Sequence, residues 1–261
     1  MKTTQQNISS QNLMGMPHQD LEQYFSVVGE KSFRATQIMK WTHQQGVTDY
    51  EQMTNLSKSL RDWLNENAQM QMPEMVSEEI STDGTRKWLL RVDEKNAVET
   101  VYIPEDGRAT LCVSSQVGCI LDCTFCATAR QGFAGNLSSA QIIAQLWFAE
   151  HRLRKQLDKS RVISNVVFMG MGEPLANFDN VVKAIQIMMD DNAYGLGKRK
   201  VTVSTSGLVP KIDKLREALD VSLAVSLHAP NDEIRNQLVP LNRRYTISEL
   251  MAACHRFLQN K

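Results

Sequence analysis

The chain has 261 residues, with 29 Lys and Arg side chains balanced by 29 Asp and Glu side chains. This length allows one large domain with its own core and a smaller second domain. A net charge of zero gives no general indication of nucleic-acid binding. The polar N-terminus lacks the apolar segment of a signal peptide, and no apolar run approaches the roughly 18 residues that span a bilayer. Five cysteines, several of them clustered, indicate a reducing cytoplasm rather than a disulfide framework.

The first part of the chain is predicted to be mainly helical. Residues 1–18 are rich in Gln, Ser, Thr and Asn, which predicts a disordered tail. Residues 19–75 then show helical spacing in three short segments, which predicts a small helical accessory domain. Acidic and basic residues are similar in number here, so the charge of this domain does not indicate an RNA-binding surface.

Residues 76–107 change to a period of two, which is typical of half-exposed strands. The dipeptides Asp83-Gly84 and Asp106-Gly107 are turn signals between these runs. We therefore expect a β-hairpin linker that leads into the strand before the cysteine cluster.

Residues 108–261 alternate between strands and helices, which predicts an α/β core. The later strands are expected over 162–169, 199–205 and 221–227, and the helices over 138–157, 179–190, 210–219 and 248–260. Ser138 and Gln141 form a capping-box pattern at the start of the first of these helices. Strict alternation implies parallel βα units joined by right-handed crossovers.

The most informative stretch is the CxxxCxxC run formed by Cys119, Cys123 and Cys126. Three thiolates on one tight loop can hold three irons of a cubane [4Fe–4S] cluster, which a fourth cysteine would close. No fourth cysteine is nearby in the sequence, so the fourth iron is free to bind a substrate. The run resembles that of the radical S-adenosylmethionine (SAM) enzymes, in which this iron binds the amino and carboxylate groups of SAM.

The alternative for the same cysteines is a structural zinc site. Zinc usually takes four protein ligands, commonly two Cys pairs or Cys pairs with histidines. His151 or His228 would then complete a Cys3His site. One cluster of three cysteines without a second pair favours iron–sulfur chemistry, and the zinc alternative stays open.

Unusual residues also follow the other expected strands, at Gly170–Pro174, Ser204–Gly207 and Ser226–Pro230. In barrel-like α/β folds the loops after the strands build the active site, so these loops and the cysteines should converge on one cavity. Gly172 would permit close approach of a ligand, and Glu173 could accept a hydrogen bond from an ammonium group. The simpler interpretations are an ordinary turn, helix-capping serines and a structural histidine.

Three further residues have simple structural interpretations. Cys112 lies in the apolar run before the cluster and fits a buried core position. Cys254 has helical spacing with its apolar neighbours and also fits a core position. Glu99 is an acid at an alternating position of an apolar run, as expected for a solvated strand face.

Together these motifs resemble the RlmN family, the bacterial dual-specificity methyltransferases that modify carbon 2 of adenosine in rRNA and tRNA. The resemblance extends from about residue 20 to the end, and it rests on the cysteine run and on Phe33–Trp41, Arg108–Cys119, Met169–Pro174, Val203–Gly207 and Ser226–Asn231. It implies an α/β fold in which residues 108–261 form a partial (βα) barrel of the radical SAM type. The helical accessory domain and the hairpin linker precede this barrel.

The resemblance also implies roles for individual residues. Cys119, Cys123 and Cys126 match the ligands of the [4Fe–4S] cluster. The residues that match SAM contacts are Gly172, Glu173, Ser204, Ser226, Leu227 and His228. Cys112 matches the thiol that resolves a protein–RNA adduct through a transient disulfide, and Glu99 matches the proton acceptor.

In this family one SAM methylates a cysteine, and a 5′-deoxyadenosyl radical from a second SAM activates that methyl group for addition to adenine. The implied substrates are 23S rRNA near the peptidyl transferase centre and tRNAs beside the anticodon. The implied electron donor is a reductant such as flavodoxin. The family resemblance further implies a cytoplasmic monomer with no membrane attachment.

One departure from the family pattern concerns the C-terminal part. The family continues beyond this chain with the last barrel strands and the methyl-carrying cysteine, and Cys254 does not match that position. We therefore expect an incomplete barrel that cannot complete methyl transfer by itself. Two alternatives stay open: a Cfr-like enzyme that methylates carbon 8 of adenosine, and a non-catalytic, metal-stabilised RNA-binding module.

Overall fold

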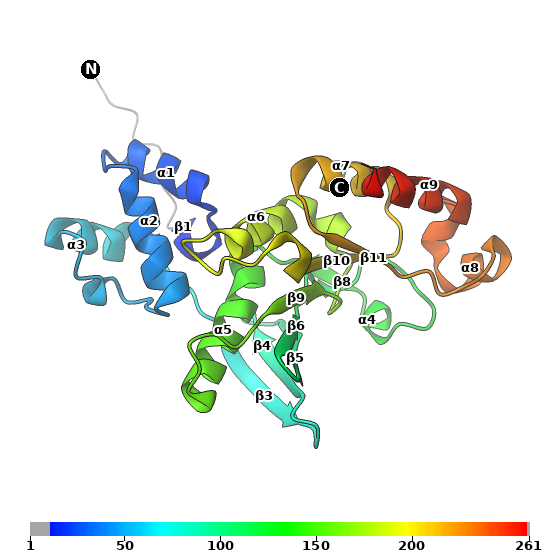
Figure 1. Cartoon of the computed structure of the whole chain (residues 1–261), viewed down its shortest axis with the longest axis horizontal. Coiled ribbons are helices and arrows are strands. Elements are labelled where there is room, and N and C mark those ends of the chain that lie inside the picture. The colour runs from blue at the N-terminus through cyan, green and yellow to red at the C-terminus, as the bar shows by residue number, and fades with distance from the viewer. Residues whose placement is uncertain (1–10, 260–261) are drawn as a thin grey trace.

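The computed structural model describes residues 11–259 (Figure 1). In Figure 1 the N-terminal helices lie at one end of the molecule, and α8 (Asp232–Leu238) and α9 (Ile247–Leu258) lie at the other, with the sheet between them. Within the described residues, no helix is both long enough and apolar enough to cross a membrane.

The N-terminal module contains the three predicted helices, α1 (His18–Val27), α2 (Phe33–Met39) and α3 (Lys58–Asn67). The remaining elements of the module are β1 (Gln11–Asn12), η1 (Leu13–Gly15), the π-helical turn η2 (Lys40–Gln44), η3 (Tyr50–Gln52) and β2 (Ala68–Gln69). Each helix buries an apolar stripe in the common core. Ser57 caps α3 by accepting a hydrogen bond from the Leu60 N–H over 3.3 Å.

The prediction of a disordered tail over residues 1–18 is wrong for its second half. The strand β1 pairs in parallel with β2. Leu13 and Met14 are buried in the core, and α1 already begins at His18. A segment with so few apolar residues is too short to show a period. The prediction of disorder therefore rested on its polar composition alone. Residues 1–10 lie outside the described residues.

A seven-stranded sheet forms the centre of the molecule, in the order β11-β10-β9-β6-β5-β4-β3. Its antiparallel half consists of β3 (Glu74–Ile80), β4 (Arg86–Arg91), β5 (Ala97–Glu105) and β6 (Arg108–Cys112). Its parallel half runs from β6 through β9 (Asn165–Phe168), β10 (Val201–Thr205) and β11 (Ser222–Val225). Both the predicted meander and the predicted parallel βα units are therefore present.

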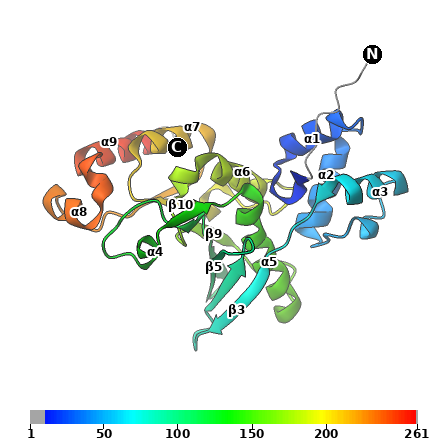
Figure 2. The same cartoon turned by 180° about the vertical axis from the view of Figure 1, so that it is seen from behind.

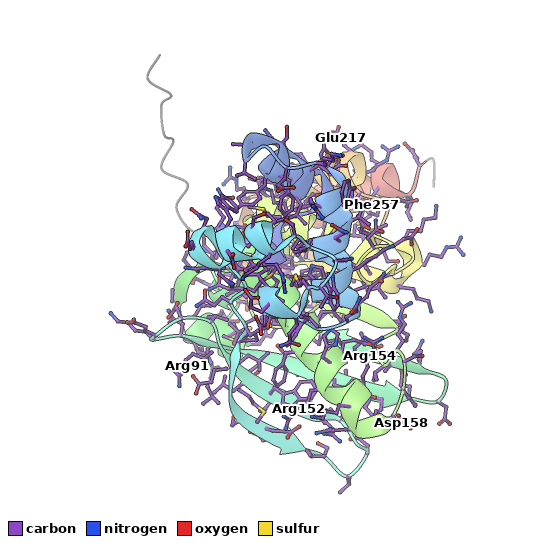
Figure 3. The ribbon with its side chains drawn as sticks, turned by 90° about the vertical axis from the view of Figure 1, so that its left-hand side faces the viewer. Arg91, Arg152, Arg154, Asp158, Glu217 and Phe257 are labelled. Carbon is purple, nitrogen blue, oxygen red and sulfur yellow. The ribbon has the colours of Figure 1, made fainter. Side chains whose placement is uncertain are left out.

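The expected hairpin linker, residues 76–107, is part of this sheet rather than a separate connection. The strand β6 pairs with β5 on one side and with β9 on the other, so the expected boundary at residue 108 is bridged by hydrogen bonds. Trp88 on β4 is fully buried and packs edge-to-face against Phe148 of α5 (Ser139–Leu157), with ring centroids 5.6 Å apart. Arg152 of the same helix pairs with Glu78 of β3 over 2.9 Å (Figure 3).

The predicted crossover helices are α5, α6 (Phe178–Met189), α7 (Val209–Ala218) and α9. The predicted capping box of α5 is formed, because Ser138 Oγ accepts from the Gln141 N–H over 3.2 Å and Gln141 Oε1 accepts from the Ser138 N–H over 2.8 Å. Short elements that periodicity did not predict are β7 (Gln116–Gly118), β8 (Phe133–Asn136), α4 (Ala127–Arg130), α8, η4 (Pro174–Asn177), η5 (Lys198–Lys200) and η6 (Pro240–Arg243). Figure 2 shows the loop with α4 between the strands and α8.

One face of α5 holds the N-terminal module against the core. Trp147 Nε1, His151 Nε2 and Arg154 Nη1 donate to the successive backbone carbonyls of residues 42–44, over 2.7, 3.2 and 2.8 Å. Spacings of four and three residues place these donors on one side of the helix. The last turn of a helix leaves its carbonyls without intrahelical partners, so α5 caps the end of η2 and fixes the module in place.

Candidate active site

The loops after β6, β9, β10 and β11 lie at one edge of the sheet because these four strands are parallel neighbours. A cleft of about 310 Å³ opens between the last three of these loops. Its lining includes four of the predicted SAM contacts, Gly172, Glu173, Ser204 and Ser226. Three of the four loops that were expected to converge therefore line this cleft, and the cysteine loop is not part of its lining.

The turn after β9 requires glycine because of its backbone conformation and its close packing against neighbouring residues. Gly172 has φ +95°, and a Cβ there would lie 2.5 Å from the Gln116 Cβ and 2.9 Å from the Gln116 backbone nitrogen. A Cβ on Gly170 would lie 2.7 Å from the Ser114 Oγ. The glycines thus allow this turn to pack against the strand end before the cysteine loop, in addition to lining the cleft.

Glu173 is a buried carboxylate that joins two loops of the cleft. Its Oε1 accepts from the Leu175 N–H over 3.1 Å, and its Oε2 accepts from the Ser206 N–H over 2.8 Å. Burial raises the pKa of Glu173, and the hydrogen bonds from Ser206, Thr205 and Leu175 oppose that shift. The carboxylate therefore has a fixed orientation at the wall of the cleft.

Ser114 and Gln116 were not predicted as site residues, yet both organise this edge of the sheet. Ser114 Oγ donates to the Glu99 carbonyl over 2.6 Å and accepts from the Met171 N–H over 2.9 Å. Gln116 is fully buried and accepts from the Glu173 N–H over 2.9 Å. A run of polar residues directly after the apolar strand of Cys112 was the sequence signal for them.

The cysteine loop is ordered by backbone hydrogen bonds. The Cys119 N–H donates to the Gly132 carbonyl over 3.2 Å, and the Cys126 N–H donates to the Cys123 carbonyl over 3.1 Å. Burial raises the pKa of the Cys119 and Cys123 thiols, and the charge of Cys126 adds to the shift at both. The three thiols are therefore electrostatic neighbours. Among the described residues, no three His, Cys, Asp or Glu side chains surround a single point as a lone metal ion requires.

The two histidines considered for a zinc site occupy different places. His151 lies at the join with the N-terminal module, where its Nε2–H donates to the His43 carbonyl over 3.2 Å, so it is not a neighbour of the cysteines. His228 has a left-handed backbone, φ 59°, and its ring packs on Phe125 of the cysteine loop with centroids 4.5 Å apart. Only His228 is therefore positioned beside the cluster cysteines.

The remaining predicted SAM contacts border the same region. The hydroxyl oxygens of Ser204 and Ser226 lie 3.5 Å apart across the ends of β10 and β11. The side chain of Leu227 is partly exposed, and its carbonyl accepts from Arg235 Nε over 3.0 Å. The loop after β11 thus lines the cleft with Ser226 and contacts the cysteine loop with His228.

Cys112 and Glu99 lie near each other on the sheet. Cys112 is directly opposite Val101, and Glu99 precedes Val101 by two residues, so both side chains are on one face. Glu99 is half-exposed and forms an ion pair with Lys87 over 3.5 Å. Burial raises the pKa of Cys112 to about 11, and the charge of Glu99 adds to this shift. All the cysteines are free thiols, so the disulfide that the resemblance implies for Cys112 is not formed here.

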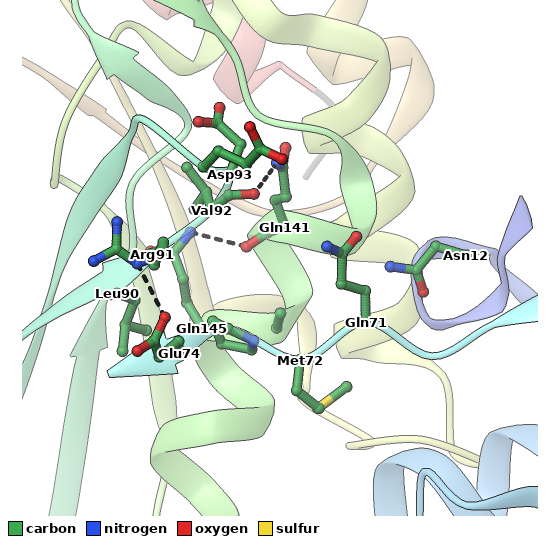
Figure 4. A pocket seen from close by; sticks show the side chains of 13 residues that line it. Asn12, Gln71, Met72, Glu74, Leu90, Arg91, Val92, Asp93, Gln141 and Gln145 are labelled. Atoms are coloured by element: carbon green, nitrogen blue, oxygen red, sulfur yellow. Dashed lines mark hydrogen bonds and ion pairs between the residues drawn. The ribbon is translucent and has the colours of Figure 1, made fainter. Parts of the chain in front are cut away.

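A second hollow, of about 280 Å³, lies between α5, the turn after β4 and the segment before β3 (Figure 4). Gln141 donates to the Val92 carbonyl there over 2.9 Å, and Arg91 pairs with Glu74 over 3.0 Å. Gln145 is turned inward and accepts from the Ser114 N–H over 2.8 Å. These polar groups hold protein elements together, away from the cysteines and the cleft.

Comparisons with known proteins agree with this geometry. Residues 11–70 match the family described as the ribosomal RNA large subunit methyltransferase N-terminal domain, and residues 113–261 match the radical SAM superfamily. Over 247 residues the chain is 59% identical to the dual-specificity RNA methyltransferase RlmN of Marinobacter nauticus, covering 95% of this chain and 67% of that protein. The crystal structure of a radical SAM methyltransferase from Sphaerobacter thermophilus matches with a TM-score of 0.87 and 42% identity, over 95% of this chain and 72% of that one.

Radical SAM proteins of this kind use a [4Fe–4S] cluster and SAM. The chemistry of the donor set fits such a cluster, because three cysteines stand on one short loop and Cys123 forms a hydrogen bond with Ser206, which lines the cleft. Two family models match successive parts of the chain, and the fold agrees with a solved relative at high similarity. The chain therefore belongs to the RlmN family of SAM-dependent radical SAM RNA methyltransferases.

Proposed function

We propose that this protein methylates carbon 2 of adenosine in 23S rRNA, at the peptidyl transferase centre, and in tRNAs next to the anticodon. The relative from Marinobacter nauticus carries the name of a dual-specificity RNA methyltransferase, and both domains of this chain match its family. The chain spans 67% of the length of that relative, so the activity proposed is that of the whole enzyme.

Cys119, Cys123 and Cys126 would hold three irons of the cluster. When bound, the cluster supplies the electron that cleaves SAM to a 5′-deoxyadenosyl radical. The protein would orient SAM through the loops after β9, β10 and β11. Glu173 and the hydroxyls of Ser204 and Ser226 offer acceptors to the amino and ribose groups of SAM, and Gly172 lines the cleft beside them.

Leu227 and His228 would bound the same site on the side of the cysteine loop. The His228 ring rests on Phe125, so a ligand held by the loop after β11 would contact the cluster loop as well. This arrangement would keep the ligand close to the cluster while excluding water from the side of β11.

We further propose that Cys112 resolves the adduct between the protein and RNA, and that Glu99 accepts the proton from the adenine ring. The two groups lie on one face of neighbouring strands at the cluster end of the sheet. In this resolution the Cys112 thiolate would attack the sulfur of the adduct, which forms an S–S bond, breaks the S–C bond to the carbon on the RNA and leaves the electron pair of that bond on the carbon. Because burial keeps Cys112 protonated, the thiol would have to lose its proton as the attack occurs.

The observation that supports this function best is the position of the three-thiol loop beside a cleft lined by Gly172, Glu173, Ser204 and Ser226. The test is anaerobic reconstitution with iron and sulfide, followed by reduction with dithionite in the presence of SAM. We expect iron incorporation and release of 5′-deoxyadenosine. Cys123→Ala should abolish both, whereas Cys254→Ala, on α9, should leave both unchanged.

The position of the methyl group tests the substrate assignment separately. The full-length enzyme is incubated with rRNA and tRNA that lack the modification, and mass spectrometry locates the new methyl group. Methylation of carbon 2 is expected. Methylation of carbon 8 would contradict the assignment, and iron-free protein after reconstitution would contradict the radical SAM chemistry as a whole.

We also propose that the enzyme acts in the cytoplasm as a monomer and receives electrons from a flavodoxin-type reductant. The free thiols favour a reducing compartment. A one-electron donor of low potential is needed to reduce a cluster of this type. Replacing dithionite by reduced flavodoxin and its reductase should sustain the release of 5′-deoxyadenosine.

A further inference from the structure

Arg235 of α8 is a buried cation that no part of the proposed chemistry uses. Its exposure is 1%, although a guanidinium is costly to remove from water. Its partners are neutral acceptors, the carbonyls of Leu227, Ser206 and Ser226 at 3.0, 2.6 and 3.4 Å, and Asn242 Oδ1 at 2.6 Å. A buried guanidinium with only neutral hydrogen-bond partners therefore indicates a role for its geometry or its charge.

The three carbonyls belong to the two loops that carry the predicted SAM contacts. Ser206 follows β10, and Ser226 and Leu227 follow β11. A planar guanidinium donates in fixed directions, so one side chain determines the spacing between these loops. The Ser206 N–H also donates to Glu173 Oε2 over 2.8 Å, which extends the connection to the loop after β9.

The same helix holds the cysteine loop. The Thr124 N–H donates to the Leu238 carbonyl over 3.1 Å, and Thr124 Oγ1 donates to the Gln237 carbonyl over 3.2 Å. These carbonyls lie at the C-terminal end of α8, where a helix has acceptors without intrahelical partners. Thr124 stands next to Cys123, so α8 contacts both the loop of the predicted cluster ligands and the predicted SAM loops.

Cys123 is also near the guanidinium. The Ser206 side chain forms a hydrogen bond with Cys123, and the Ser206 carbonyl accepts from Arg235. Ser206 thus bridges the two groups, with its carbonyl on the guanidinium and its side chain on the Cys123 thiol. A fixed positive charge in a poorly solvated place acts strongly on any change of charge beside it.

We propose that Arg235 is a positioning residue that locks the cysteine loop to the SAM loops and supplies a fixed positive charge beside Cys123 that favours reduction of the cluster. This inference rests on the proposed function, because it assumes a cluster on Cys119, Cys123 and Cys126. The step is the gain of one electron from an external low-potential donor, here dithionite. The reduced cluster carries one more negative charge, which a nearby buried cation stabilises.

The test compares two substitutions in the anaerobically reconstituted protein. Arg235→Gln removes both the positive charge and the planar set of guanidinium N–H donors. Arg235→Lys keeps the charge but removes the planar set of donors. Arg256→Gln is the matched control, because Arg256 pairs with Asp213 on the surface of α9, away from the cluster. The measurements are iron content, the midpoint potential from a titration followed by electron paramagnetic resonance, and SAM affinity by equilibrium dialysis.

We expect Arg235→Gln to shift the midpoint potential to more negative values, and Arg235→Lys to stay near the wild-type potential. Both should bind SAM about 5- to 30-fold more weakly, because the carbonyl positions of the two loops are no longer fixed. Arg256→Gln should change neither quantity. If Arg235→Gln does not fold, as judged by circular dichroism, the SAM affinity of Arg235→Lys decides whether the guanidinium N–H donors position the loops.

Two failures are distinguishable. Wild-type protein without iron after reconstitution would overturn the proposed function. A wild-type protein with a normal cluster, together with Arg235 variants of unchanged potential and unchanged SAM affinity, would overturn the role of Arg235 alone.

Discussion

The side chain of Gln116 accepts a hydrogen bond from the Glu173 N–H over 2.9 Å. It thereby joins the strand that precedes the cysteine loop to the turn that lines the cleft. Its Nε2 donates to Asn136 Oδ1 over 2.8 Å, so the β7–β8 hairpin is part of the same connection. The fully buried amide of Gln116 thus ties three chain segments together at the end of the parallel strands.

Replacing Gln116 by Leu should leave the buried N–H of Glu173 without a partner. We expect the free energy of unfolding to fall by about 1–3 kcal/mol, the usual cost of an unsatisfied buried group. Urea denaturation followed by circular dichroism measures this. Gln52→Leu, at an exposed position of η3, is the control and should change stability by less than about 0.5 kcal/mol. Equal effects of the two substitutions would contradict the role of Gln116.

Gly172 and Gly107 both have positive φ, +95° and +74°, but only Gly172 has close neighbours. Gly107→Ala should cost about 1–2 kcal/mol of stability from backbone strain alone. Gly172→Ala should cost more, because its Cβ would lie 2.5 Å from the Gln116 Cβ and 2.9 Å from a backbone nitrogen. SAM affinity should also fall in Gly172→Ala and stay normal in Gly107→Ala. Identical stability and affinity in the two variants would show that the contact with Gln116 is unimportant.

The join between the modules should make stability depend on pH. Burial lowers the pKa of His43 to about 3 and that of His151 to about 4, whereas both should titrate near 6.5 in the unfolded chain. Between about pH 6.5 and pH 4 the unfolded state binds more protons, so the free energy of unfolding falls as the pH falls. The slope is at most about 1.4 kcal/mol per pH unit for each histidine.

Urea denaturation at pH 7.5 and pH 5.0 measures this loss. We expect His43→Gln to lose less stability between the two pH values than the wild type does. His255→Gln is the control because His255 is exposed on α9. The same loss in both variants would contradict the assignment to His43.

Trp147→Phe removes the indole N–H that donates to the Thr42 carbonyl over 2.7 Å. Hydrogen exchange of the amides of α2 and η2 should then become faster, because one of the three donors with which α5 caps the end of the helix is lost. Trp41→Phe is the matched control, since its indole bonds to Asn55 within the module. Faster exchange at the join in Trp41→Phe, with none in Trp147→Phe, would be the opposite of the expected result.

Cys112 should react slowly in the folded protein. With a pKa raised to about 11, only about one thiol in a thousand is ionised at pH 8, and the thiolate is the form that alkylates. Iodoacetamide labelling followed by peptide mass spectrometry should show Cys112 protected in the folded state and labelled in urea. Rapid labelling of the folded protein at pH 8 would contradict this environment.

Much of the fold was predictable because long elements show periodicity and caps. The helix α5 was identified from its apolar spacing and its Ser138–Gln141 capping box, and the three loops of the cleft from their positions after apolar strands. The helix α8 and the β7–β8 hairpin were missed because segments this short show no clear period.

Individual site residues also differ in how well the sequence predicts them. The cysteines were predicted as cluster ligands from their spacing, since a cluster needs several thiolates on one loop. Arg235 and Gln116 gave no such signal, because a single Arg or Gln in a polar stretch is normally exposed. Their burial follows from partners far away in the sequence, such as Ser206 for Arg235 and Glu173 for Gln116.

The strand β6 is antiparallel to one neighbour and parallel to the other, and Cys112 lies opposite Val101 on one side and Val167 on the other. A sheet bends as a unit, while the loops at its edge move independently. The spacing between the backbones of Glu99 and Cys112 is therefore set by strand pairing, and it should stay constant when the surrounding loops move.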